Sequence, residues 1–184
     1  MKRPSFTLLG AALLCAIGAH SVDAKIERLT LDSMVQKTDD AIFGEITATE
    51  VIRIDHPVDG PELYFTHLTI NGESLITGDL VTTTVTFPGG FINDEDGVWN
   101  SEAPSADDIK LGNVVVAFSK HVENLGGDLE CNALYASHGG LFRTVNTPDG
   151  MVVLGRGEGY AIDANVRLED LGKGVRTFAK KEEL

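Results

Sequence analysis

The stretch Asn93-Asp94-Glu95-Asp96-Gly97 places three carboxylates and one side-chain amide within five residues. Calcium is typically bound by several such oxygens presented from one loop. Asp94, Asp96 and the later Glu102 are therefore candidate calcium ligands. The spacing is not that of an EF-hand, because counting from Asp94 puts the glycine at the fourth position rather than the sixth. The stretch predicts either an irregular calcium site or solvated charges on a long loop.

Trp99, the single tryptophan of the chain, follows this acidic stretch and lies outside any strand pattern. An exposed loop tryptophan can anchor a protein partner or stack on a sugar ring. A tryptophan in this position can equally fold back over one end of the domain. In the first case, we expect Trp99, Phe91 and Asn93 to contact a protein or a glycan.

Two other motifs could support catalysis or metal binding, and neither is complete. His138-Gly139-Gly140 resembles the oxyanion loop of lipases, but Gly72-Glu73-Ser74-Leu75-Ile76 lacks the second glycine of a nucleophile turn. Zinc-binding spacing is absent from the histidines beyond residue 24, which are His56, His67, His121 and His138. A glycine turn at 138–140 and a hydrogen-bonded core histidine at His67 are the simpler interpretations.

The N-terminal residues indicate export. Lys2 and Arg3 precede an apolar stretch over residues 6–18, and Val22-Asp23-Ala24 has the small residues that a signal peptidase recognises. The apolar stretch is too short for a permanent membrane anchor. We expect residues 1–24 to be a cleaved signal peptide and residues 25–184 to form a single domain, periplasmic or extracellular, with no membrane insertion after cleavage.

Net charge limits the classes of binding partner, and cysteine content limits disulfide formation. The net charge is −13, which disfavours nucleic acids and anionic lipid surfaces but permits a cation or a basic partner. Cys131 has no cysteine partner beyond residue 24, so no internal disulfide is expected there. Its strand-like surroundings favour a buried thiol over a reactive one. We expect a monomer.

Hydrophobic periodicity predicts a mainly β fold. Residues 81–87 alternate between apolar residues and threonines, which is typical of a strand with one buried face. Apolar spacing predicts short helices at 30–37 and 168–178. Strands are expected at 41–54, 62–70, 81–87, 113–119, 128–137, 141–146 and 151–154. These elements predict a small antiparallel OB-like barrel or sandwich of about seven strands, with a short N-terminal helix and a C-terminal helix.

Five short motifs follow one another along the chain: "LTLDSMVQKTDDAIFGEITATEVI", "YFTHLTINGESLITGD", "TVTFPGG", "LGNVVVAFSK" and "HGGLFRTV". Their order resembles that in a widespread group of secreted bacterial proteins of unknown function. Thr77-Gly78 stands where that group usually has Lys-Gly. The resemblance implies an OB-like barrel similar in outline to netrin-like and inhibitor modules. It carries no catalytic residues, and the cysteines of true netrin-like domains are absent.

These observations favour a non-catalytic exported module that binds a protein, glycan or cation through residues 88–112, hereafter loop 88–112. Pro88, Gly89 and Gly90 break the strand that precedes this loop, and connections of such length are usually functional or disordered. Calcium is the only cofactor that the sequence suggests. Two alternatives remain: a secreted hydrolase with dispersed catalytic residues, and a structural domain associated with the cell envelope.

Overall fold

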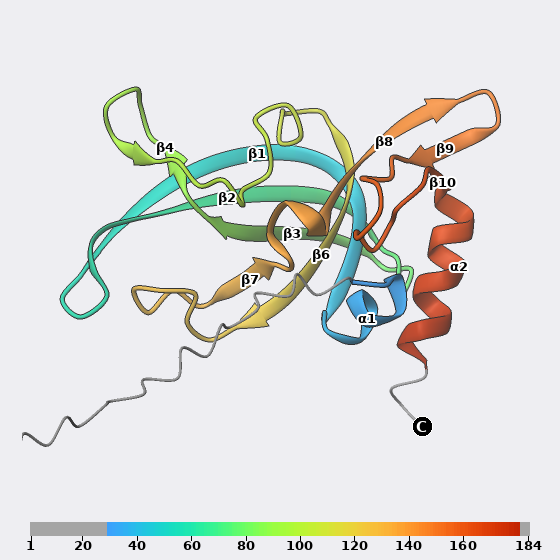
Figure 1. Ribbon diagram of the computed structural model, residues 1–184, viewed down its shortest axis with the longest axis horizontal. Coiled ribbons are helices and arrows are strands. Elements are labelled where there is room, and N and C mark those ends of the chain that lie inside the picture. The colour runs from blue at the N-terminus through green and yellow to red at the C-terminus, as the bar shows by residue number, and fades with distance from the viewer. Residues whose placement is uncertain (1–28, 181–184) are drawn as a thin grey trace, which may run out of the picture.

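A computed structural model describes residues 29–180, and the signal peptide expected at 1–24 lies outside this range. Five strands form a closed barrel in the order β1-β2-β3-β7-β6, with β6 returning to β1 (Figure 1). This confirms the mainly β barrel. All pairings within it are antiparallel except the short parallel pairing of β3 with β7. The strands are β1 (Asp40–His56), β2 (Gly60–Ser74), β3 (Leu80–Pro88), β6 (Val114–Val122) and β7 (Cys131–Leu134).

The alternation of β3 follows the prediction from its sequence. Val85 and Phe87 are buried in the barrel interior, whereas Thr82 and Thr84 are exposed on the outer face. Thr86 shares that outer face but is buried, and its hydroxyl lies 2.7 Å from His67 Nδ1 on β2. β7 covers four residues, fewer than the predicted strand at 128–137.

The molecule has two apolar layers. Buried side chains from all five strands fill the barrel interior, and Leu141 of the following strand joins them. The residues from the five strands are Ile42, Ile46, Leu68, Ile70, Val85, Phe87, Val115, Ala117 and Leu134. The second layer lies between the barrel wall and two helices, α1 (Leu31–Gln36) and α2 (Leu168–Ala179). Both predicted helices are therefore confirmed.

Each helix has a local explanation in its sequence. The hydroxyl of Thr30 caps α1 by accepting a hydrogen bond from the Ser33 N–H at 3.2 Å. In α2, Leu171 and Val175 are one turn apart and both are buried. Among the described residues, no helix is long and apolar enough to cross a bilayer.

A C-terminal hairpin extends the sheet beyond the barrel. After the 3₁₀ turn η1 (Ser137–Gly140), β8 (Leu141–Thr147) and β9 (Gly150–Val153) pair around the predicted turn at 147–150. Gly150 has a φ of 109°, a conformation that favours glycine. β10 (Val166–Arg167) then pairs with β9 and leads into α2.

β1 is much longer than the strand that closes the barrel against it. Its residues Asp40–Glu45 pair with β6, whereas β2 remains its partner along almost its full length. A bulge between Ile46 and Ala48 marks the point where β1 leaves β6. Loop 88–112 rises beside this outer half of β1 and contains two short strands, β4 (Gly90–Phe91) and β5 (Gly97–Val98). α2 stands at the opposite end of the molecule (Figure 1).

Candidate functional site

Loop 88–112 begins by turning back onto the barrel wall. Gly89 and Gly90 have φ values of 96° and 134°, which allow the sharp change of direction after Pro88. The Thr66 hydroxyl donates a hydrogen bond to the Gly89 carbonyl at 2.6 Å. A side chain at Gly90 would collide with Thr66 and with Val51, so this position needs glycine. The Pro-Gly-Gly break thus brings the chain into close contact with β1 and β2.

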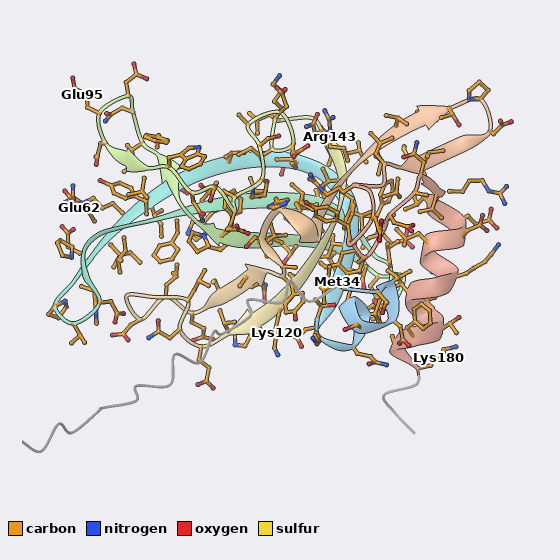
Figure 2. All side chains as sticks on the ribbon, viewed as in Figure 1. Met34, Glu62, Glu95, Lys120, Arg143 and Lys180 are labelled. Carbon is orange, nitrogen blue, oxygen red and sulfur yellow. The ribbon has the colours of Figure 1, made fainter. Side chains whose placement is uncertain are left out.

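The next residues form a miniature hairpin, in which β4 pairs with β5. The side-chain oxygen of Asn93 accepts hydrogen bonds from the N–H groups of Glu95 and Asp96, at 2.9 and 3.0 Å. Asn93, predicted as a binding residue, therefore builds the turn with this oxygen. Figure 2 shows Glu95 at the tip of the hairpin, at the same end of the molecule as Glu62.

Asp96 fastens this hairpin to the barrel. The hydroxyl of Tyr64 on β2 donates a hydrogen bond to Asp96, and Arg53 Nη1 on β1 lies 3.6 Å from the same carboxylate. The Arg53 guanidinium also stands over the Tyr64 ring, 5.9 Å from its centre. The hydrogen bond to Asp96, together with burial, raises the pKa of Tyr64. The phenol therefore stays protonated and keeps donating to Asp96 at neutral pH.

Trp99 follows this anchor and is 75% exposed. It does not fold back over the end of the barrel, one of the two alternatives that the sequence left open. A second anchor comes directly after it, because the Asn100 side chain donates to the Pro88 carbonyl at 2.9 Å. Trp99 is thus held between two fixed neighbours while its ring faces solvent. Three further apolar side chains of the hairpin are exposed: Phe91, Ile92 and Val98.

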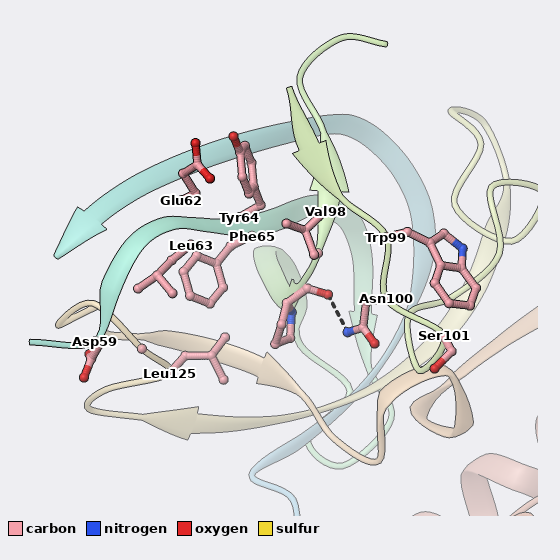
Figure 3. A pocket seen from close by; sticks show the side chains of 13 residues that line it. Asp59, Glu62, Leu63, Tyr64, Phe65, Val98, Trp99, Asn100, Ser101 and Leu125 are labelled. Carbon is pink, nitrogen blue, oxygen red and sulfur yellow. Dashed lines mark hydrogen bonds between the residues drawn. The ribbon is translucent and has the colours of Figure 1, made fainter. Parts of the chain in front are cut away.

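Two grooves flank the segment that carries Trp99. The first, which we call the side groove, has a volume of about 510 Å³ and contains Leu63, Phe65 and Leu125. Figure 3 shows the Trp99 ring on the other side of its chain segment from these three side chains. The second, the mouth groove, lies where β1 separates from β6 and has a volume of about 590 Å³. Its lining includes Thr49, Val51, Thr66, Phe87, Phe91, Val98, Trp99 and Ile109.

The three proposed calcium ligands have different surroundings. Asp94 and Glu102 are exposed, whereas Asp96 is half-buried and already bound by Tyr64 and Arg53. Within residues 29–180, no group of three or more His, Cys, Asp or Glu side chains is arranged to hold a metal ion. The calcium hypothesis requires convergence of these carboxylates, and the contacts of Asp96 do not provide it.

The end of loop 88–112 is fixed by an ion-pair cluster. Asp108 is almost fully buried and lies 3.2 Å from Arg143 Nε and 3.1 Å from Arg156 Nη2. Burial by itself would raise the pKa of Asp108. Hydrogen bonds from Ser105 and Arg156 and the two positive charges outweigh it, so the pKa is lowered. This cluster ties the loop to β8 and to the segment after β9.

The side chains that could have supported catalysis, Ser74, His138 and Cys131, all form contacts within the fold. The Ser74 hydroxyl is buried and donates to Asp40 at 2.6 Å. His138 Nε2 lies 2.9 Å from the Tyr160 hydroxyl, and its Nδ1 lies 3.2 Å from the Glu102 carbonyl. Gly139 and Gly140 are the buried residues of the η1 turn that leads into β8. Cys131 is half-buried, and burial raises the pKa of its thiol despite a hydrogen bond with Thr86.

No family model matches this chain, and comparisons with curated proteins and with solved structures likewise find no match. The assignment of the candidate site therefore rests on the geometry of its residues alone.

Several residues of this site were not predicted from the sequence. Val51 and Thr66 line the mouth groove, and Arg53 and Tyr64 hold the hairpin. Their strands were predicted, but no sequence pattern connects them with loop 88–112. One signal was available: β1 and β2 were predicted to be longer than the strand at 113–119, so part of them had to extend past it.

Proposed function

We propose that this protein is an exported, non-catalytic module with an OB-like barrel that binds a protein or a glycan through loop 88–112. The strand order β1-β2-β3-β7-β6, with a parallel β3–β7 pair, supports the OB-like assignment. Barrels of this type bind ligands on their strand faces and connecting loops. The resemblance to secreted bacterial proteins and the signal-like N-terminus support export.

The exposed ring of Trp99 is the observation that carries the proposal. A tryptophan ring buries a large apolar area when a partner covers it, and tryptophan is enriched among the residues that dominate binding energies. Its neighbours on both sides are anchored, at Asp96 and at Asn100. An ordered loop loses less conformational entropy on binding than a mobile one, so the interaction free energy is retained as affinity.

Binding rather than catalysis is supported by the contacts of the reactive side chains. Ser74 is buried on Asp40, and the Cys131 thiol has a raised pKa, so neither is an activated nucleophile. His138 is held by Tyr160 and by a backbone carbonyl. By contrast, the apolar side chains around Trp99 are exposed and adjacent to two grooves.

The test compares Trp99→Ala with Leu80→Ala in screens against immobilised saccharides and peptides. Leu80 is 88% exposed and lies at the start of β3, outside both grooves, so it controls for loss of an exposed apolar side chain. We expect Trp99→Ala to weaken binding about tenfold or more. Leu80→Ala should bind as the unmodified protein does. A ligand that binds both variants equally would contradict the proposal.

A further inference from the structure

We infer that the ligand of loop 88–112 is an extended, basic polypeptide segment that pairs as an added strand with the outer half of β1, residues Ala48–His56. This inference rests on the proposed function and names the class of its ligand. The segment would lie along β1 and place apolar side chains in the mouth groove.

The outer half of β1 has a free edge. The pairing of β1 with β6 ends at Glu45, and two backbone hydrogen bonds of Ile46, with Gly112 and Asn113 at 2.9 Å each, complete it. Beyond the bulge, β1 continues to His56 with β2 on one side. Within the described part of the chain, no strand pairs with its other side. Such an edge presents unpaired N–H and C=O groups, which can bind an extended peptide.

The mouth groove lies directly beside this edge. Thr49 and Val51 of β1 line it, and their spacing of two residues places both side chains on the same face. Phe91, Val98 and Trp99 line the groove from the loop and are all exposed. A strand added to β1 would direct every second side chain toward these residues. Backbone pairing would supply affinity, and the groove would select apolar side chains at alternate positions.

Charge identifies the partner as basic. Loop 88–112 has one basic residue, Lys110, and six carboxylates. Asp96, Asp107 and Asp108 already form ion pairs with Arg53, with Lys110, and with Arg143 and Arg156, respectively. The exposed Asp94, Glu95 and Glu102 remain as the excess negative charge of the loop. On the β1–β2 hairpin, the Arg53 guanidinium is already balanced by Asp55, Glu62 and Asp96 at 3.1 to 3.6 Å. Like charges disfavour edge-to-edge pairing of two copies of this chain, whose net charge is −13. Lysine or arginine side chains at the positions facing away from the groove would complement this surface.

The test uses a synthetic peptide of about eight residues, the length that spans the free edge, with alternating valine and lysine. A copy N-methylated along one edge keeps the charge and side chains but removes the hydrogen-bond donors on that edge. A second copy has glutamate in place of lysine. Neutral hexasaccharides of glucose and N-acetylglucosamine provide the glycan probes. Affinity is measured on the full chain, and hydrogen exchange locates the amides that binding protects.

We expect the basic peptide to bind and to slow exchange at residues 48–55. Binding should weaken about tenfold or more for the N-methylated copy, for the acidic copy and for Trp99→Ala. Thr49→Lys places an inward-facing charge on the edge and should abolish binding, because inward lysines are a natural block on strand addition. Thr49→Val also removes the hydrogen bond of the Thr49 hydroxyl to the Ile109 carbonyl but adds no charge, and it should bind normally. Leu80→Lys, on an exposed position outside the groove, is the control and should bind normally.

Equal affinity for the N-methylated and unmodified peptides would overturn the inference, and so would a dimer whose residues 48–55 are protected without peptide. Saccharides that bind through Trp99 while the peptide does not bind would also overturn it, but would leave the proposed function standing. Peptide binding that protects residues 48–55 and is unaffected by Trp99→Ala would instead overturn the proposed function.

Discussion

The Tyr64 hydroxyl donates a hydrogen bond to the Asp96 carboxylate, and this contact joins β2 to the tip of a loop 32 residues further along the chain. Tyr64 is a buried residue of β2, whereas Asp96 belongs to the β4–β5 hairpin, whose apolar side chains are exposed. The bond therefore transmits the rigidity of the barrel to the segment that carries Trp99. The position of the exposed ring depends on it.

Tyr64→Phe tests this coupling, because it removes the hydroxyl and keeps the ring. We expect faster hydrogen exchange at residues 92–98 and lower fluorescence anisotropy of Trp99, since the hairpin loses its main anchor. The thermal midpoint should fall only modestly, because Tyr64→Phe removes one partly exposed hydrogen bond and keeps the packing of the ring. Unchanged exchange at 92–98 would show that Asp96 is not the anchor.

Asp108→Asn should destabilise the protein by about 2 kcal/mol, because it leaves Arg156 and Arg143 without their shared carboxylate. Asp107→Asn is the matched control, since that carboxylate pairs with Lys110 at the surface. Chemical denaturation at neutral pH measures the free energy of unfolding of both variants. Equal stability of the two variants would contradict the role assigned to the buried cluster.

The Asp108 carboxylate also makes the stability of the folded protein depend on pH. Because the pKa of Asp108 is lower in the folded protein than its ordinary value of 3.8, the folded state binds fewer protons there. Its contribution to stability is therefore present above that value and is lost as the pH falls through the folded pKa. Below pH 3.8, the stability difference between the unmodified protein and Asp108→Asn should shrink. A difference that stays constant down to that acid range would be inconsistent with the lowered pKa.

Val85→Asp should unfold the domain, because Val85 is fully buried in the barrel interior. An unpaired charge there costs several kcal/mol, about 4 or more. Thr84→Asp puts the same charge on the neighbouring exposed position, where it should be tolerated. Circular dichroism and thermal melting distinguish the two variants. A folded Val85→Asp protein would mean that the strand faces are assigned the wrong way round.

Millimolar calcium should leave the thermal midpoint unchanged, because Asp96 is already bound by Tyr64 and Arg53. Differential scanning fluorimetry with and without calcium measures this directly, with magnesium as the control cation. A rise of several degrees that disappears in Asp94→Asn would restore the calcium hypothesis.

Much of the fold was predictable because its signals are local. The alternation over residues 81–87 and the helical spacing of Leu171 and Val175 each depend on neighbouring residues, and both predictions are confirmed. The closing pair of β1 with β6 joins segments far apart in the chain. Its register, which ends at Glu45 and leaves Ala48–His56 with a free edge, follows from three-dimensional packing.

The candidate site was predicted only in part, for a similar reason. The Pro-Gly-Gly break and the single tryptophan indicate loop 88–112 as a binding site, and Phe91 and Trp99 are exposed there. The role of Asn93 could have been inferred, since an asparagine before a tight turn commonly bonds to the backbone two or three residues ahead. The pairing of Asp96 with Tyr64 had no signal in the sequence, because it depends on how the hairpin is seated on β2.

The intrinsic fluorescence of Trp99 tests the central claim most directly, since this residue is the only tryptophan. In the free protein, we expect emission typical of a water-exposed indole and efficient quenching by iodide or acrylamide. Titration with the valine–lysine peptide or a saccharide that binds should shift the emission to shorter wavelength and protect the ring from quenching, because the ligand covers it. Saturable binding, measured independently by calorimetry, with no change in the emission or quenching of Trp99 would contradict the assignment of loop 88–112 as the binding surface.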